Sequence, residues 1–485
     1  MKKEDDQKAV ILITIDALRS DSLKSYGYFR NTAPNIENFA KKGVVFLNTI
    51  TNGPESPTAF SSIFTSILPL LDGGYSPLPP QKISLPQILK ENGISTYSIH
   101  SNPNLGRYFN YNRGFDIFLD GERYKKQTGE KIKHRFSFYL NKILNYRNLF
   151  QKLIYRVKGF NLIKSWLRKK VPALTDVLLP FTPIAYNAPY VANKLNSFLK
   201  TIQKPFFIWA HFMDVHNPYN PPSQNILKFR EKDFSISERE FLLKKVYPRV
   251  KDIKITPKMI KDLKTLYDSE INFIDESLTI FFNNLRTYIK NNCLVIITAD
   301  HGESFYEHGL FGHQGSVYEE VLRVPLIIVE LGKNLKKKTI QETVQLIDLT
   351  PTILDYFGIK IPENFQGLSL LSLIEGNSIK RKNIIISECY QKSGFMKRNK
   401  EEGYILLAIR NQGWKYIFDQ ENGSEFLFNL NLDPKEKINL ADENPQKLSE
   451  FRIIKEYHLN KISQTFEEKQ KMLDSISKFK SDKVK

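Results

Sequence analysis

Three short runs of uninterrupted apolar residues stand out along the chain, and each of them stops at a titratable residue. Continuous apolar runs, rather than alternating ones, are typical of strands that are buried on both faces, as in a parallel sheet flanked by helices. We therefore predict an α/β fold built on a large, mixed, mostly parallel sheet sandwiched by helices. Because sites in open α/β sheets lie at the carboxyl ends of strands, the three polar ends could converge on one crevice. The runs are Ala9 to Ile15 before Asp16, Pro205 to Ala210 before His211, and Leu294 to Ala299 before Asp300.

The C-terminal part of the chain has a different pattern. Short β-like runs follow one another closely there, and a charged helical tail comes after them. Such spacing predicts a small antiparallel subdomain. We therefore divide the chain into a main α/β domain over residues 1–375 and a C-terminal subdomain with its tail over residues 376–485. The β-like runs cover residues 383–387, 405–409, 414–418 and 425–430.

The positive charge of the chain is concentrated in one segment. The whole sequence has 71 Lys and Arg against 52 Asp and Glu, a formal net charge of +19, which indicates an anionic partner or substrate. Residues 121–170 hold 15 Lys and Arg against two Glu, and their apolar residues recur at helical spacing. We interpret this stretch as part of a basic helical insertion over about 121–195. It is either a solvated cap on the core or a surface for peripheral contact with an anionic membrane or a polyanionic glycan. We expect no nucleic-acid partner.

Cysteine usage and hydropathy narrow the class of protein further. The two cysteines, Cys293 and Cys389, are far apart and have no CxxC spacing, so they support neither a disulfide framework nor a cysteine zinc site. The first apolar run has about seven residues, which is too short for a signal sequence or a membrane span. We therefore expect a cytoplasmic or peripheral membrane protein.

Two of the strand ends have the composition of a metal site. Asp16 follows the first apolar run, and Asp300, His301, Gly302 and Glu303 follow the third. Carboxylate and imidazole groups are hard to borderline ligands for a divalent cation, and a glycine allows the backbone to turn sharply beside them. The alternative is that the aspartates cap the helices that follow.

A series of longer motifs gives these residues a context. In their order and spacing, over about residues 9 to 441, they resemble the sulfatase family of the alkaline phosphatase superfamily. The resemblance implies a large α/β sandwich that holds a divalent metal, a strand-end nucleophile and a tetrahedral sulfate or phosphate group. The motifs are ILITIDALRSDSL (11–23), NGPESPTAFSSIFTS (52–66), AHFMDVHNPYNPP (210–222), ITADHGESFYEHGLFGHQGSVYEEVLRVPLII (297–328), IDLTPTILDYFGI (347–359) and FLFNLNLDPKEKINLA (426–441).

The resemblance also implies a departure at the nucleophile. The family motif Cys-x-Pro-Ser-Arg falls on residues 56–60, which read SPTAF and contain neither the Cys nor the Arg. Formylglycine sulfatases oxidise that Cys, so here an unmodified Ser56, or Thr58, is the expected nucleophile, its hydroxyl activated by metal contact. This arrangement resembles the phosphatase and phosphotransferase branches of the superfamily.

The implied metal shell is smaller than in typical relatives. Ala17 stands where formylglycine sulfatases commonly carry a further metal-binding Asp. The resemblance then leaves Asp16, Ser56, Asp300 and His301 as ligands of one divalent ion. Calcium, manganese, zinc and magnesium all remain open as its identity.

Imidazoles complete the candidate site. The family uses the spacing of His211 and His216 to hold and protonate the ester, and His313 matches a position that touches the sulfate or phosphate oxygens. His100 and Asn102 lie where formylglycine sulfatases show a Lys and a His. Neutral core histidines are the alternative interpretation.

The sequence therefore predicts a metal-dependent hydrolase that cleaves a terminal sulfate or phosphate ester, on a sulfated or phosphorylated glycan or a lipid-linked substrate. One alternative is a transferase, similar to phosphoethanolamine or phosphoglycerol transferases, that passes the group to an acceptor at a membrane surface. Another is a non-catalytic binder of polyanionic glycans.

Overall fold

The structure is a computed structural model that describes residues 7–71, 74–121, 186–247, 253–333, 339–378, 384–392 and 403–482. Most of the predicted basic insertion, including residues 122–185, lies outside the described residues. Among the described helices, none is long and apolar enough to cross a membrane.

The centre of the fold is a nine-stranded sheet in which the three predicted runs are neighbours. They form β1 (Ala9–Ile15), β5 (Phe206–Phe212) and β6 (Cys293–Ala299), and every residue in them is buried. Strand β1 lies between the other two and pairs with both in parallel. The sheet order is β10-β2-β9-β6-β1-β5-β3-β4, with β11 paired to β2, and β9 is antiparallel to both of its neighbours. The remaining strands are β2 (Val44–Ile50), β3 (Ser95–Ile99), β4 (Ile117–Leu119), β9 (Arg323–Leu331), β10 (Thr339–Ile340) and β11 (Val344–Gln345).

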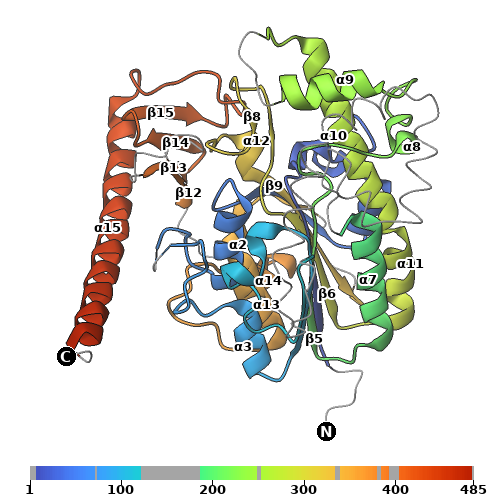
Figure 1. Cartoon of the computed structure of the whole chain (residues 1–485), viewed down its shortest axis with the longest axis horizontal. Coiled ribbons are helices and arrows are strands. Elements are labelled where there is room, and N and C mark those ends of the chain that lie inside the picture. The colour runs from blue at the N-terminus through green and yellow to red at the C-terminus, as the bar shows by residue number, and fades with distance from the viewer. Residues whose placement is uncertain are drawn as a thin grey trace, which may run out of the picture.

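Helices cover both faces of this sheet, as the uninterrupted apolar strands require (Figure 1). The prediction of a mostly parallel sheet sandwiched by helices is therefore confirmed. One face carries α1 (Pro34–Ala40), α7 (Ala188–Thr201), α10 (Pro257–Ser277) and α11 (Thr279–Tyr288); the other carries α2 (Ser56–Thr65), α3 (Leu85–Glu91), α13 (Leu349–Phe357) and α14 (Leu371–Ile374). Shorter elements are α8 (Ser223–Ile226), α9 (Ile236–Phe241), α12 (Glu319–Leu322) and the hairpin of β7 (Ser304–Phe305) and β8 (Phe311–Gly312).

A separate antiparallel sheet forms the C-terminal subdomain, as predicted. Its strands pair in the order β12 (Ile385–Lys392), β13 (Gly403–Asn411), β14 (Trp414–Asp419) and β15 (Ser424–Asn429). Alternate residues of β13 serve two cores: Leu407 packs in a cluster with α15 (Pro445–Asp482), and Leu406 packs in a cluster with Leu322 of α12. The small sheet is thus held between the long C-terminal helix and the main domain.

Buried ion pairs reinforce the contact between the small sheet and the main domain. The Lys415 side chain is fully buried, and its Nζ lies 2.9 Å from Glu319 Oε1 and 2.7 Å from Glu436 Oε1. Arg410, on the same face of the sheet, also pairs with Glu319. Glu319 begins α12, so this ion-pair cluster joins the C-terminal subdomain to the segment that leads into β9.

We expect Lys415→Met to destabilise the protein by about 3 kcal/mol, because it removes the buried cation that pairs with Glu436, while Arg410 still pairs with Glu319. Denaturant unfolding checks this value. The control is Lys447→Met, which breaks the Lys447–Glu450 pair on α15, where the Glu450 side chain is 57% exposed. It should cost less than about 1 kcal/mol. Equal effects of the two substitutions would contradict a structural role for the buried pair.

Candidate active site

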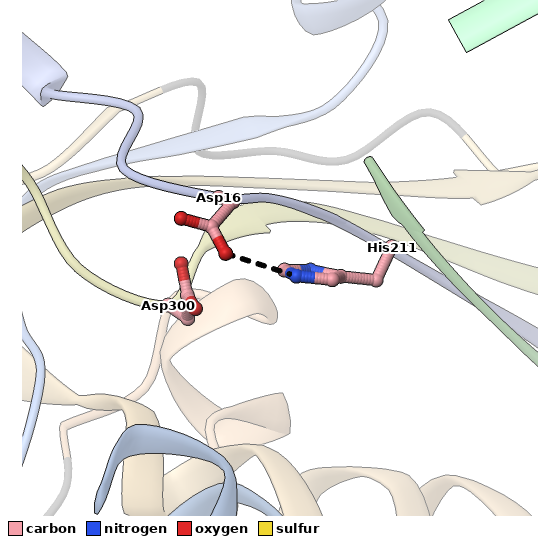
Figure 2. Close-up of side chains that lie close together, drawn as sticks. All are labelled: Asp16, His211 and Asp300. Atoms are coloured by element: carbon pink, nitrogen blue, oxygen red, sulfur yellow. Dashed lines mark hydrogen bonds and ion pairs between the residues drawn. The ribbon is translucent and has the colours of Figure 1, made fainter. Parts of the chain in front are cut away.

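Strand register brings the two aspartates and a histidine together. Ile15 lies opposite both Phe212 and Ala299, so Asp16 and Asp300 emerge at the same level of the sheet. With His211 they form a fully buried group whose candidate ligand atoms all lie within 4.8 Å of one another. Figure 2 shows the Asp16 and Asp300 carboxylates close together, with the His211 ring directed at Asp16. The predicted convergence of strand ends is therefore present.

Three buried polar atoms in this cluster have no hydrogen-bond partner among the described residues: Asp16 Oδ1, Asp300 Oδ2 and His301 Nε2. His301 Nε2 lies 3.7 Å from each of the two carboxylate oxygens. His301 Nδ1 lies 2.9 Å from the Gly302 carbonyl oxygen, a contact that requires the ring hydrogen on Nδ1 and leaves a lone pair on Nε2. Unpaired buried acceptors are costly, and these three would all be satisfied by a divalent cation. The residues present therefore fit a metal ion.

The second oxygen of Asp16 faces the protein instead. Asp16 Oδ2 accepts hydrogen bonds from Ser56 Oγ at 3.1 Å and from Asn102 Nδ2 at 3.2 Å, and it lies 3.3 Å from His211 Nε2. Asn102 Nδ2 also donates to Ser56 Oγ at 2.9 Å. The side-chain oxygen of Asn102, Oδ1, accepts from the Asn104 N–H, so the orientation of the Asn102 side-chain amide is set by its own partners. Ser56 is thus held by a donor and an acceptor.

The local backbone explains why Ser56 and Asp16 point into the site. Ser56 is the first residue of α2, where the unpaired N–H groups and the helix dipole favour negative charge. Ala17, directly after Asp16, has a φ of 56°, in the left-handed region that non-glycine residues seldom occupy. Its carbonyl accepts from Tyr267 Oη at 2.7 Å and its N–H donates to Asp300 Oδ1 at 3.3 Å. These bonds stabilise a strained turn that separates the strand from the loop.

Thr58 is placed differently from Ser56. Its hydroxyl donates to the Glu55 carbonyl at 2.7 Å and accepts from the Glu55 N–H at 3.2 Å, as part of the capping box at the start of α2. These bonds use both the donor and an acceptor of the hydroxyl. The structure therefore brings Ser56, and not Thr58, into contact with Asp16.

A row of imidazoles lies beside the carboxylates. The ring centroids of His301 and His313 are 4.1 Å apart, and those of His313 and His216 are 5.3 Å apart. His313 Nδ1 lies 3.2 Å from Glu303 Oε1. The sequence-predicted His211, His216 and His313 are therefore all gathered around the same cluster.

Charges within this row shift the pKa values of its members. Burial favours neutral His313, but the hydrogen bond and the charge of Glu303 outweigh it and raise the pKa of His313 above its ordinary value. Burial likewise opposes ionisation of Asp16, but the charge of His216 and the hydrogen bond from His211 hold the Asp16 pKa well below its ordinary range. The site therefore contains an ionised carboxylate facing basic rings.

Sequence reasoning missed the groups that hold Glu303. Its Oε2 accepts from Tyr219 Oη at 3.1 Å and from Tyr247 Oη at 3.0 Å. Tyr219 stands in the quoted 210–222 motif, but no pattern in the sequence marks Tyr247. His100, in contrast, does not join the cluster: it is buried against Phe118 and Trp209, and burial lowers its pKa well below the ordinary value.

Two family models match the chain. The family model described as Sulfatase matches residues 8–359, and the model described as N-sulphoglucosamine sulphohydrolase, C-terminal, matches residues 306–464. An arylsulfatase of Clostridium perfringens is 25% identical over 92% of this chain and 93% of its own length.

Solved structures show the same fold. The phosphonate monoester hydrolase of Agrobacterium radiobacter has a TM-score of 0.68 at 19% identity, over 95% of this chain and 96% of its own. A protein solved in complex with its substrate, D-glucosamine-2-N,6-O-disulfate, has a TM-score of 0.66 at 18% identity, over 94% and 98% of the two chains.

We expect Asp300→Asn to lose most of its bound divalent metal, because the substitution removes an anionic ligand from a buried cluster. Elemental analysis of the purified protein measures the metal content. Asp214→Asn is the matched control: Asp214 is also a buried acid, and asparagine retains the oxygen that accepts from the Ala188 N–H. The control should keep the metal content of the parent. Equal content in Asp300→Asn and the parent would exclude Asp300 as a ligand.

Proposed function

Because the chain belongs to the sulfatase family, and is a sulfuric or phosphoric ester hydrolase by that membership, we propose that it cleaves a terminal monoester with the unmodified hydroxyl of Ser56 as nucleophile. The observation that carries this proposal is the placement of Ser56 Oγ between Asn102 Nδ2 and Asp16 Oδ2, next to three buried ligand atoms without partners. A hydroxyl in this environment is oriented and buried, as a covalent nucleophile requires.

Ser56 is prepared for attack by its two partners. Its hydrogen points to Asp16 Oδ2, which gives the proton a path away from the nucleophile, and Asn102 donates to the oxygen on which negative charge develops. The N-terminus of α2 adds a favourable field for that charge. Attack forms the bond from Ser56 Oγ to sulfur or phosphorus while the bond to the leaving alcohol oxygen breaks.

Asp16, Asp300 and His301 would hold one divalent ion, with Ser56 completing the shell. When bound, the ion supplies charge neutralisation for the nonbridging oxygens and lowers the pKa of a neighbouring hydroxyl. A shell that mixes carboxylate and imidazole is compatible with manganese, zinc, magnesium or calcium, and among these the nitrogen ligand favours zinc.

The histidines handle the ester and its proton. His313, kept basic by Glu303, is suited to donate a hydrogen bond to the transferring group. His216 Nδ1 is engaged with the Asn217 carbonyl at 2.6 Å, which leaves its Nε2 to protonate the leaving oxygen. In the second half-reaction the same nitrogen accepts a proton from the water that releases the group from Ser56. His211 contacts Asp16, not the ester, in this arrangement.

The proposed substrate is a sulfated or phosphorylated sugar or lipid-linked alcohol. The similar protein solved with a disulfated glucosamine supports the sugar, and the similar phosphonate monoester hydrolase shows that this fold also accommodates a phosphorus centre. The lack of both Cys and Arg in residues 56–60 supports a covalent ester intermediate on a serine hydroxyl rather than formylglycine chemistry.

We expect Ser56→Ala to lower turnover of p-nitrophenyl sulfate or p-nitrophenyl phosphate by at least about a thousandfold, because the nucleophile is removed. Thr58→Ser, which keeps the capping hydroxyl, should retain the activity of the parent. Release of p-nitrophenol with manganese, zinc, magnesium or calcium measures both. Turnover in Ser56→Ala equal to that of the parent would exclude Ser56 as the nucleophile. Turnover that requires an added sugar or lipid alcohol would favour a transferase. No turnover with any of the four metals would favour a binding protein.

The Ser56 side chain is expected to have its encoded mass, because the motif lacks both Cys and Arg. Peptide mass mapping over residues 52–66 decides this. A peptide lighter by about 2 Da would reveal oxidation to an aldehyde and would restore formylglycine chemistry.

A further inference from the structure

A continuous chain of polar groups approaches Asp16 from inside the protein. Trp209 Nε1 donates to Thr14 Oγ1 at 3.0 Å, Thr14 Oγ1 lies 2.9 Å from His211 Nδ1, and His211 Nε2 lies 3.3 Å from Asp16 Oδ2. All four side chains are fully buried. Thr14 and His211 are register partners on the adjacent strands β1 and β5, so the strand pairing itself sets their separation.

The chemistry of Trp209 and Asp16, the two ends of this chain, determines where the hydrogens of the intervening groups lie. The indole of Trp209 can only donate, so Thr14 Oγ1 accepts from it. Asp16 Oδ2 already accepts from Ser56 and Asn102 and acts as an acceptor toward His211 too, so His211 Nε2 must carry a hydrogen. A bare Nε2 would place its lone pair against a carboxylate oxygen at 3.3 Å, in a buried position where that repulsion is not screened.

The Thr14 hydroxyl decides whether the other ring nitrogen, His211 Nδ1, carries a hydrogen. Its hydrogen can reach His211 Nδ1 at 2.9 Å or the Ala210 carbonyl at 3.5 Å, and the first distance is that of a normal hydrogen bond while the second is not. When Thr14 donates to His211 Nδ1, all four groups are satisfied in one direction. The chain then runs from Trp209 through Thr14 and His211 to Asp16.

We propose that Thr14 holds His211 as the tautomer with its hydrogen on Nε2, which makes His211 a positioning residue for Asp16 and not a metal ligand. With Oδ2 occupied by His211, Ser56 and Asn102, Asp16 presents Oδ1 to the metal. The proposal deepens the proposed function, because it takes Oδ1 as the metal-facing oxygen. Distance alone would allow His211 to be a metal ligand, because its candidate ligand atom lies within 4.8 Å of those of Asp16 and Asp300.

We call the hydrogen-bonded series Trp209, Thr14, His211 and Asp16 the relay, and aromatic packing holds it in place. The Trp209 ring lies 4.9 Å from both Phe60 and Phe64, which are residues of α2, and 4.8 Å from His100. The His211 ring meets Phe60 edge-on at 5.1 Å. Helix α2 begins at Ser56, so the relay and the nucleophile are supported by the same helix.

The first test uses the metal-free protein. Nitrogen-15 NMR of histidine-labelled protein should show His211 with hydrogen on Nε2 and none on Nδ1, the signal being assigned by its loss in His211→Asn. Thr14→Val removes the donor to Nδ1 and should change this signal, whereas Thr14→Ser restores the hydroxyl and should return it. Hydrogen on Nδ1 with a bare Nε2 in the parent, or an unchanged signal in Thr14→Val, would overturn the proposal.

The second test uses Mn²⁺ as the only added ligand. Electron paramagnetic resonance should detect one coordinated imidazole nitrogen, which is lost in His301→Gln and kept in His211→Asn. Loss of a nitrogen coupling in His211→Asn would make His211 a ligand and would disprove the proposal.

Affinity for Mn²⁺ provides the matched comparison. Thr14→Val should weaken binding by about tenfold, as loss of a group that orients a ligand does, while Thr14→Ser stays within about threefold of the parent. The control is Thr298→Val: Thr298 is the register partner of Thr14 on β6, and its hydroxyl donates to the Pro325 carbonyl outside the relay. It should stay within about threefold. Equal weakening in Thr14→Val and Thr298→Val would contradict a specific role for Thr14.

The metal-free NMR measurement and the Mn²⁺ measurements separate this proposal from the proposed function. If the parent binds no Mn²⁺, zinc or other divalent ion, the metal-dependent function fails, while the metal-free NMR measurement still decides the tautomer. If metal binds and turnover is found, but His211 carries no hydrogen on Nε2, the proposed function stands and only the relay is wrong.

Discussion

The arrangement of the site depends on two carboxylates that parallel strands bring together inside the protein. Asp16 and Asp300 are both fully buried, and the register of β1 with β6 places the two residues at the same level of the sheet. Ionised groups at such depth are costly unless they are paired or coordinated. Among the described residues, His301 Nε2 lies 3.7 Å from each of the two unpartnered oxygens, and with the ring hydrogen on Nδ1 this nitrogen carries a lone pair. A divalent cation would satisfy all three of these buried atoms.

The two oxygens of Asp16 divide the site into two parts. Oδ2 contacts Ser56, Asn102 and His211. Oδ1 is one of the three buried atoms that have no hydrogen-bond partner among the described residues. The proposed nucleophile and the proposed metal position are therefore linked through one carboxylate. A change at any of the three groups on Oδ2 should alter the orientation of Oδ1, since the carboxylate turns as a unit.

The segment after β6 connects the site to the C-terminal subdomain. It begins with Asp300 and His301, continues through Glu303 and His313, and ends in α12, where Glu319 meets the buried Lys415. The N–H of Gly302 donates to the Val321 carbonyl at 2.7 Å, which closes this segment on itself. The small sheet lies outside the main sheet, yet it therefore supports the segment that carries two proposed metal ligands, Asp300 and His301, and the imidazole of His313.

The sequence by itself determined the central strands, the mixed sheet with helices on both faces, the small antiparallel sheet and the family. It could do so because these depend on local patterns: uninterrupted apolar runs mark strands buried on both faces, and the motifs keep their order along the chain. It also placed Asp16, Asp300 and His301 at strand ends. It left open the choice between Ser56 and Thr58, two residues apart, and it could not foresee Tyr247 or the bond between Thr14 and His211. Only the tertiary structure decided which of the two hydroxyls contacts Asp16 and which groups Tyr247 and Thr14 contact, because the helix cap engages the Thr58 hydroxyl. Hydrogen bonds between distant strands follow from register and side-chain direction, which no local pattern encodes.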